Sequence, residues 1–440
     1  MNKNVVIHVG PGKTGSSALQ VWLNSHHKIL FHHGIFYPEH TVDTNGISSG
    51  NIDTIANHNQ NGSRTLNEKK LTRLLNEFEQ SEAHTLLLSS EYFFAMLRPL
   101  FAQLPNARYV GFIRDPLEHH ESDYNQRVKL HSHYLPFHAS LASFPAIDAF
   151  ARVMDDCKGI NLQLRPYGKG LFYGGSIVSD LLFLIAPEFA LPENETIDCA
   201  RVVNPSYDYA TREFKRLLNY FPIQHLELAL HRQLQKRPAS DVCISVIPEK
   251  AQTSANTAHV KRLETFIKHR QMESLTPLLE ALKGRPLKVY KNQDASPQEL
   301  LSVAHWLEEN DSVLFGKICK IVDKHRYFYL DNPAFWAIFS VPLRNGNKKW
   351  WKNEDEEERA AINCAPICNK SLATFKQRTR VGADVHSPHL LASMGEFALQ
   401  NGEYQYAERL LTQALQLNPR QLIALQHINA ARSGLKRNNY

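Results

Sequence analysis

The stretch Val5-Val6-Ile7-His8-Val9-Gly10-Pro11-Gly12-Lys13-Thr14-Gly15-Ser16-Ser17 decides the expected fold of this chain. Its apolar, β-branched first part predicts a buried strand. The glycines then allow a tight turn, and Ala18-Leu19-Gln20-Val21-Trp22-Leu23 predicts the helix that follows. A strand, a glycine-rich loop and a helix form an anion cradle, because backbone N–H groups and the positive helix end point at one spot. The stretch therefore predicts a site for a phosphate or sulfate ester.

The loop differs from the standard nucleotide-triphosphate loop. That pattern, G-x-x-x-x-G-K-[ST], requires a glycine five residues before Gly12, where this chain has Ile7. The run Lys13-Thr14-Gly15-Ser16-Ser17, with Trp22 five residues further on, resembles the 5′-phosphosulfate loop of sulfotransferases. These enzymes use 3′-phosphoadenosine 5′-phosphosulfate (PAPS). The alternative is a phosphate-like turn without this chemistry.

A second motif supports the same resemblance. Residues 107–113 predict an apolar strand that ends at Arg114, and Pro116 suits the first turn of a helix. Ser122 follows Arg114 by eight residues, about two turns into that helix. Sulfotransferases hold the 3′-phosphate of their cofactor with an arginine and a serine at this spacing. The alternative is a surface Arg114–Asp115 pair and a serine on a helix face.

A third apolar run, Leu86-Leu87-Leu88-Ser89-Ser90-Glu91, predicts a strand that ends in a polar cluster. Glu91 precedes Arg114 by 23 residues. The resemblance implies that Glu91 is the base that takes the proton from an acceptor hydroxyl. Three alternatives stay open: Glu39 or His58 is the base, or Glu91 only orients Lys13.

The resemblance to PAPS-dependent sulfotransferases, in particular bacterial, carbohydrate-type members, assigns further roles. It implies that Lys13 and Glu91 are catalytic, and that Lys13 stabilises charge on the leaving phosphate. The acceptor is expected to be a hydroxyl of a glycan or glycolipid. The implied cofactor-binding residues are Gly12, Lys13, Thr14, Gly15, Ser16, Ser17, Arg114 and Ser122.

Composition is that of an ordinary globular protein, with 43% hydrophobic and 21% charged residues among 440. The formal net charge of +6 is consistent with anionic ligands, and without a dense basic run nucleic-acid binding is not expected.

No signal-peptide pattern and no stretch of ~18 apolar residues is visible, so a cytoplasmic chain without a membrane span is expected. The six cysteines are scattered, which favours free buried thiols. His120-Glu121-Ser122-Asp123-Tyr124 lacks the second histidine of a zinc motif, so no metal site is expected.

Strand-like runs that alternate with amphipathic stretches predict an α/β fold: a P-loop-like central parallel sheet flanked by helices, followed by an all-α C-terminal region. We expect a sulfotransferase domain at 1–318, a helical or linker segment at 319–380 and a helical repeat at 381–440. Ser296 to Gly316 resembles the closing helix of the sulfotransferase domain, whereas the insert from Gln224 to Lys291 has no counterpart. The charged run Trp350 to Arg359 predicts a solvated linker or an exposed helix.

The C-terminal sequence resembles one tetratricopeptide repeat. The residues on that spacing are Leu391, Gly395, Gly402, Tyr404, Ala407, Leu411, Ala414 and Pro419. Roughly three repeats are usually needed to bury the apolar faces, so this one must pack on Lys320 to Lys370, on the catalytic domain or on a second chain. It binds a protein partner, associates with a second copy of this chain, or is a helical hairpin that only packs.

Two other functional classes stay open. A Mg-ATP-dependent P-loop kinase would need a carboxylate for the metal, for which Asp115 is the candidate. A non-catalytic adaptor would act through the C-terminal repeat and would not need Lys13, Arg114 and Ser122.

Overall fold

The computed structural model describes residues 3–42, 48–59, 63–189, 206–221, 223–238, 244–324 and 388–438. The chain divides into two compact units. Unit 1 comprises Met1–Asn125, His138–Ser206 and Asp241–Asn292, and unit 2 comprises Gln126–Phe137, Tyr207–Ser240 and Gln293–Tyr440. Each unit is built from separate pieces of chain, and the boundaries expected near residues 318 and 380 stay a prediction.

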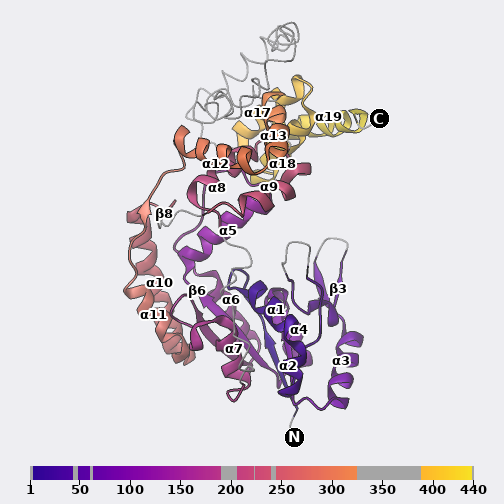
Figure 1. Ribbon diagram of the computed structural model, residues 1–440, viewed down its shortest axis with the longest axis vertical. Helices are drawn as coiled ribbons and strands as arrows, with labels where there is room; N and C mark the ends of the chain where they lie inside the picture. The colour runs from indigo at the N-terminus through magenta and orange to yellow at the C-terminus, as the bar shows by residue number, and fades with distance from the viewer. Residues whose placement is uncertain are drawn as a thin grey trace. The chain divides into compact units, whose positions relative to one another are not determined.

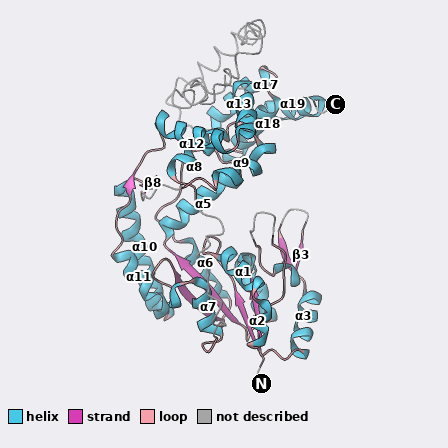
Figure 2. Cartoon of the chain, viewed as in Figure 1, coloured by secondary structure: helices cyan, strands magenta, loops and turns pink. Residues whose placement is uncertain are grey.

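Unit 1 is built on a five-stranded parallel sheet with the order β2-β5-β1-β6-β7 (Figure 2, magenta). Its strands are β1 (Asn4–His8), β2 (Ile35–Phe36), β5 (Thr85–Ser89), β6 (Arg108–Arg114) and β7 (Asn161–Tyr167). The central strand β1 pairs with β5 through Val6 and Leu87, and with β6 through Val6 and Arg108. Because all strands are parallel, their carboxyl ends lie at one edge, where the loop after His8 begins. The predicted mixed α/β fold with a parallel sheet is confirmed at this level.

Helices cover both faces of the sheet. Alternate residues of β1 point to opposite faces, so that Val6 belongs to one core and Ile7 to the other. The core around Val6 is closed by helices α1 (Ser16–Ser25), α2 (His27–His32) and α7 (Ile177–Ile185). The core around Ile7 is closed by helices α3 (Glu68–Gln80), α4 (Leu97–Gln103) and α6 (Pro145–Asp156). The continuous apolar runs of the central strands follow from this two-sided burial.

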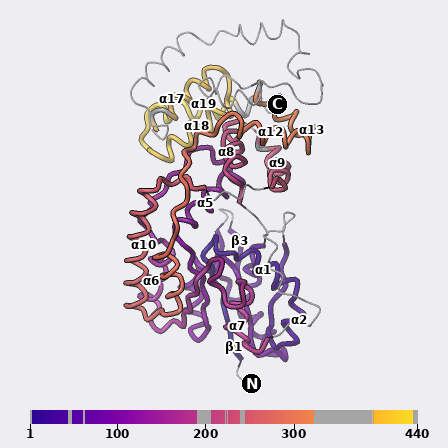
Figure 3. Tube along the Cα trace, turned by 60° about the vertical axis from the view of Figure 1, so that its left-hand side comes forward, coloured from indigo at the N-terminus to yellow at the C-terminus, as the bar shows by residue number. Residues whose placement is uncertain are grey.

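The insert without an expected counterpart contributes to the core around Ile7. Helix α10 (Glu249–Arg270) lies beside α6 (Figures 1 and 3), and Leu263 and Phe266 pack into the same core as Phe150. Helix α11 (Thr276–Lys283) follows through the short helix η5 (Glu273–Leu275). The parallel pair β8 (Ile244–Ser245) and β9 (Val289–Tyr290) joins the two ends of this segment.

Smaller elements surround the carboxyl edge of the sheet. They are η1 (Ile52–Thr54), the antiparallel hairpin β3 (Ala56–His58) and β4 (Arg64–Leu66), η2 (Glu91–Met96), η3 (Tyr173–Gly175) and α5 (Pro116–Leu130). Helix η2 begins with Glu91, directly after β5, and α5 begins directly after β6. The division between the two units passes through α5, after Asn125.

Unit 2 is helical in the residues described. Its elements are α8 (Tyr209–Leu218), η4 (Gln224–Leu226), α9 (Glu227–Leu234), α12 (Pro297–Asn310), α13 (Ser312–Lys324), α17 (Pro388–Gln400), α18 (Tyr404–Leu417) and α19 (Leu422–Asn438). The expected closing helix from Ser296 to Gly316 is two helices, because Asp311 leaves the helical conformation and its carboxylate caps the second one at Leu314. Helix α8 carries the fully buried Lys215, whose ammonium donates to Glu227 at 3.1 Å; burial lowers the pKa of this lysine to about 8.

The helices α17, α18 and α19 pack together around one apolar core. A Cβ on Gly395 would lie only 2.7 Å from Leu411 Cγ, so glycine permits the close approach of α17 and α18. Ala407 and Ala414 are fully buried. Within unit 2, Arg409 of α18 donates to the Ser132 carbonyl at 2.6 Å. The helical C-terminal region is thus confirmed, whereas residues 350–359 and most of the expected 319–380 segment lie outside the described residues.

Within the described part of the chain, no helix is long and apolar enough to cross a membrane. Cys157 and Cys319 are both buried, and Cys157 forms no disulfide. The other four cysteines, at positions 199, 243, 364 and 368, lie outside the described residues.

Candidate functional site

The loop between β1 and α1 has an unusual backbone. Gly10, Lys13 and Gly15 have φ of 78°, 69° and 74°, in the left-handed region that disfavours side chains. Lys13 adopts this conformation although it carries a Cβ. Thr14 is buried, and its hydroxyl donates to the Pro11 carbonyl at 2.5 Å, which closes the turn from inside. The loop is therefore held in one specific shape.

The first turn of α1 presents an unsatisfied hydroxyl. Gly15 caps the helix without a side chain, so the first N–H groups of the helix receive no capping hydrogen bond from it. Ser16 Oγ is buried and has no hydrogen-bond partner among the described residues. Ser17 Oγ donates to the Ser48 carbonyl at 3.3 Å. Because buried polar groups are normally paired, Ser16 Oγ together with this helix N-terminus fits an anionic oxygen.

Two glycines allow neighbouring side chains to lie close to the loop. A Cβ on Gly15 would lie 2.9 Å from Tyr167 Cε2, and a Cβ on Gly12 would lie 3.3 Å from Glu91 Oε2. Glu91 of η2 therefore lies beside Gly12, and Tyr167, at the end of β7, lies beside Gly15. Any larger residue would fill this cradle.

Arg114, the last residue of β6, is tied to the loop. Its Nη1 donates to the Lys13 carbonyl at 3.0 Å. Its Nε and Nη2 donate to Glu118 Oε2 at 3.4 and 3.3 Å, and its guanidinium lies 5.3 Å from the centre of the Tyr167 ring. These contacts set the orientation of the guanidinium at the carboxyl edge of the sheet.

Ser122 lies in the second turn of α5 and is half-buried. It follows Glu118 by four residues, so the two share a helix face. Because Glu118 contacts Arg114, this is the face of α5 that is turned toward Arg114. Ser122 therefore lies on the same face of α5 as Glu118, which contacts Arg114.

The charges around the loop influence one another. Burial and the nearby Arg114 guanidinium lower the pKa of Lys13, and Asp123 and Glu91 oppose this shift. Desolvation raises the pKa of Glu91, although its side chain is exposed at the rim, and the Lys13 ammonium opposes that shift. Lys13 and Glu91 therefore lie close enough to affect each other's protonation.

Sequence reasoning missed His119, Asp123 and Tyr167 as neighbours of the loop. Burial lowers the pKa of His119 to about 4, with further lowering from His120, Arg114 and Lys13 and an opposing effect of Asp123. His119 and Asp123 are four residues apart and so share a face of α5. The signal that could have found His119 and Asp123 was their four-residue spacing on the helix that follows Arg114 and carries Ser122. Tyr167 has no comparable local signal, because it reaches Gly15 from another strand.

The alternative bases are engaged elsewhere. Glu39 lies 2.9 Å from His27 Nε2, and Asp53 lies 2.7 Å from His58 Nε2. Glu39 and Asp53 both line a hollow of about 690 Å³ beside α2 and α3, together with His32.

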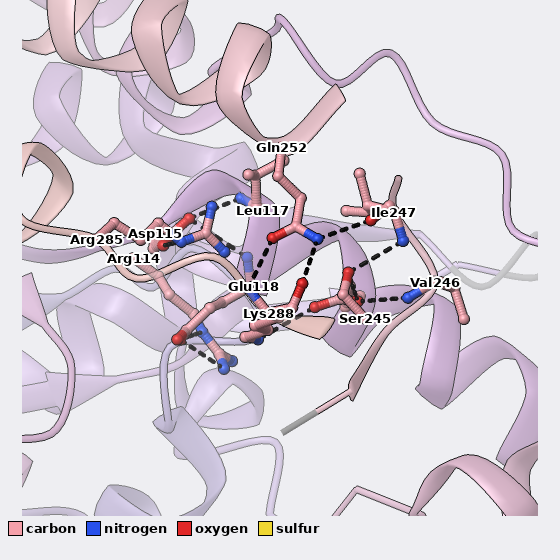
Figure 4. Close-up of polar contacts among 11 residues, drawn as sticks. Arg114, Asp115, Leu117, Glu118, Ser245, Val246, Ile247, Gln252, Arg285 and Lys288 are labelled. Atoms are coloured by element: carbon pink, nitrogen blue, oxygen red, sulfur yellow. Dashed lines mark hydrogen bonds and ion pairs between the residues drawn. The ribbon is translucent and has the colours of Figure 1, made fainter. Parts of the chain in front are cut away.

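Asp115, the candidate metal carboxylate, is used within the protein (Figure 4). Its Oδ1 accepts from the Leu117 and Glu118 backbone N–H groups at 2.8 and 3.4 Å, and its Oδ2 lies 3.0 Å from Arg285 Nε. Desolvation raises its pKa, and Arg285 opposes the shift. In the part of the chain that is described, no three His, Cys, Asp or Glu side chains form a group that could hold a metal ion.

Comparison of the chain with protein-family models, with curated proteins and with solved structures found no match.

Proposed function

We propose that this protein is a sulfotransferase that transfers the sulfuryl group of PAPS to an acceptor hydroxyl, with a P-loop-like loop as its donor site. The observation that carries the proposal is the contact between Arg114 and the Lys13 carbonyl at 3.0 Å. It joins the two motifs that resemble the 5′- and 3′-phosphate sites of the sulfotransferase family. Two anion-binding groups from separate strands at one sheet edge suit a ligand with two phosphate positions.

The residues present fit this ligand. The loop amides, the N-terminus of α1 and the unpaired Ser16 Oγ would hold the 5′-phosphate, with Gly12 and Gly15 leaving room for it. Arg114 and Ser122 would hold the 3′-phosphate, since a guanidinium offers several donors in a fixed plane and a hydroxyl adds one more. Thr14 and Ser17, both expected to bind the cofactor, already donate their hydroxyls to backbone carbonyls. We therefore assign them mainly to the shape of the loop.

PAPS would supply the activated sulfuryl group. Lys13 would place its ammonium near the oxygen on which negative charge develops, and this electrostatic contact is stronger where water is excluded. Glu91 would accept the proton of the acceptor hydroxyl. Desolvation raises its pKa, which makes it a stronger base than an ordinary glutamate, and the nearby Lys13 ammonium opposes that shift.

The acceptor is proposed to be a glycan or glycolipid hydroxyl. This part of the proposal rests on the glutamate base, by resemblance to carbohydrate-type sulfotransferases. The kinase alternative is weaker, because Asp115 caps α5 and pairs with Arg285 in place of facing the loop. A non-catalytic adaptor is weaker as well, because it would not need Arg114 held against the loop.

The test is ligand-dependent thermal unfolding followed by transfer assays. A ligand that binds only the folded protein raises the unfolding midpoint. We expect 3′-phosphoadenosine 5′-phosphate (PAP) to raise the midpoint and Mg-ATP at the same concentration to leave it unchanged. Radiolabelled PAPS with a panel of glycans, glycolipids and small alcohols would then identify the acceptor. Stabilisation by Mg-ATP alone would support the kinase, and stabilisation by neither would support the adaptor.

A further inference from the structure

The part of the insert that runs from β8 to β9, residues 244–290, contacts the first two turns of α5 (Figure 4). Two carboxylates form ion pairs with this segment: Asp115 just before α5, and Glu121 in the second turn of α5. Arg285 and Lys288 are the two cations involved. The insert therefore contacts the same helix that follows Arg114 and carries Ser122.

The inner contact is the ion pair between Arg285 and Asp115. Arg285 Nε lies 3.0 Å from Asp115 Oδ2, and the two side chains are only 9% and 14% exposed. The buried Arg285 Nη1 has no hydrogen-bond partner among the described residues. Removing one partner of such a pair leaves the other charge buried without compensation, which is strongly unfavourable.

Asp115 connects this ion pair to Arg114. Its second oxygen caps α5 by accepting from the Leu117 and Glu118 N–H groups. The Glu118 carboxylate in turn accepts from the Arg114 guanidinium. The path from Arg285 to Arg114 thus runs through an ion pair, a helix cap and a second ion pair.

The outer contact secures the insert. Glu121 Oε1 accepts from Ser245 Oγ at 2.7 Å and from the Val246 N–H at 3.2 Å, and Glu121 Oε2 lies 3.2 Å from Lys288 Nζ. Gln252 of α10 donates to the Ile247 and Lys288 carbonyls at 2.7 and 3.0 Å. These contacts hold the chain at Ser245 in β8 and at Lys288, which follows Arg285 by three residues.

We infer that Arg285 is a positioning residue: by pairing with Asp115 it holds the first turn of α5, and so keeps Arg114 aimed at a phosphate or sulfate group. The identity of that group as a 3′-phosphate rests on the proposed function. The insert thereby gains a role in ligand binding although none of its own side chains is required to touch the ligand.

The experiment compares Arg285→Met and Arg285→Lys with wild type. Its control is Arg270→Met, because Arg270 also joins the insert to another helix of unit 1, through an exposed ion pair with Asp155 of α6 at 2.9 Å. Calorimetry measures affinity for PAP and for adenosine 5′-phosphosulfate, which lacks the 3′-phosphate. We expect Arg285→Met to lower the affinity for PAP at least tenfold and the affinity for adenosine 5′-phosphosulfate by less than threefold. Arg285→Lys should restore part of the loss, and Arg270→Met should bind like wild type.

A second readout is independent of the ligand. Hydrogen–deuterium exchange of a peptide covering residues 114–122 should become faster in Arg285→Met and stay unchanged in Arg270→Met. If Arg285→Met does not fold, the double variant Asp115→Asn/Arg285→Met removes both charges and leaves none uncompensated. A folded Arg285 variant with wild-type PAP affinity and wild-type exchange would overturn the inference. A wild-type protein that binds no PAP would instead overturn the proposed function, and the exchange result would then decide the role of Arg285.

Discussion

Arg114 Nη1 donates to the Lys13 carbonyl at 3.0 Å, so the end of β6 and the loop after β1 form one structure at the carboxyl edge of the sheet. The contact uses the backbone of Lys13 and leaves the Lys13 side chain to other interactions. It also places two cationic residues side by side, which is one reason for the lowered pKa of Lys13. Within the protein, Glu118 accepts from the Arg114 guanidinium, and Asp123 and Glu91 oppose the lowering of the Lys13 pKa.

We expect Lys13→Ala to lower turnover by about 100- to 1000-fold, as is typical when one preorganised electrostatic contact is lost. The fold should survive, because alanine carries the same Cβ into the left-handed position that Lys13 already occupies. Steady-state turnover and circular dichroism check both points. Near-wild-type turnover of the folded variant would remove Lys13 from the mechanism.

Arg114→Ala should lower the affinity for PAP about 10- to 100-fold, because hydrogen bonds to charged groups contribute more than neutral ones. Ser122→Ala should lower the same affinity only about two- to tenfold, because its hydroxyl is neutral. Calorimetry with PAP and with adenosine 5′-phosphosulfate is the measurement, and the loss should be larger for PAP. Arg108→Ala is the matched control, since Arg108 lies at the other end of β6 and donates to the Leu184 carbonyl. Equal losses for both ligands would place Arg114 and Ser122 elsewhere in the site.

Gly15→Ala should abolish ligand binding, since its Cβ would lie 2.9 Å from the Tyr167 ring at a φ of 74°. Gly159→Ala is the control, because Gly159 has a φ of 83° and nothing within 4 Å of an added Cβ. Both variants should lose about 1–2 kcal/mol of folding stability from the backbone conformation. Only Gly15→Ala should lose stabilisation by PAP in thermal unfolding. A Gly15→Ala variant that still binds PAP would show that the loop is not the donor site.

The pH dependence of kcat/KM should reflect Glu91 and Lys13. Glu91 must be deprotonated to act as base, and desolvation raises its pKa above the ordinary value of 4.5. Activity should therefore be lost on acidification at a pH above 4.5. On the alkaline side Lys13 must stay protonated, and its lowered pKa should bring the loss of activity below pH 10.5.

Glu91→Gln should remove the loss of kcat/KM at acidic pH and should lower turnover strongly. Glu39→Gln is the matched variant, because Glu39 is the competing candidate base and pairs with His27. It should keep the wild-type profile. Removal of the loss at acidic pH by Glu39→Gln, with Glu91→Gln fully active, would transfer the base role to Glu39.

A chain that ends near Gly382 should keep its affinity for PAP, because the repeat lies far from the donor motifs in sequence. It should show a changed oligomeric state, lower solubility or poorer use of a large acceptor, because the repeat no longer covers its partner surface. Within unit 2 that surface includes Ser132 and Tyr134, which contact Arg409 and Gln413 of α18. Calorimetry and light scattering are the measurements. Loss of PAP binding by a folded truncated chain would show that the C-terminal helices belong to the active site.

The strands of the sheet, the loop after β1 and the helix after Pro116 are predictable because each depends on a short stretch of neighbouring residues. The runs around Val6, Leu87 and Val110 are apolar on both faces, as buried parallel strands must be, and each is a strand of the sheet. The loop after β1 and the helix after Pro116 follow from glycine and proline chemistry. These features were sufficient to predict the α/β fold and to bring Lys13 and Arg114 together.

Tertiary structure alone decided the contacts between distant segments. Tyr167 reaches Gly15, and Arg285 reaches Asp115, although neither residue stands in a recognisable motif. Likewise, the buried Lys215 of α8 pairs with Glu227 in a unit assembled from separate pieces of chain. Hydrophobic periodicity records which face of an element is buried, but it does not record which other element covers that face. The sequence by itself therefore determined the sheet and the loop, whereas the supports of the site became visible only in three dimensions.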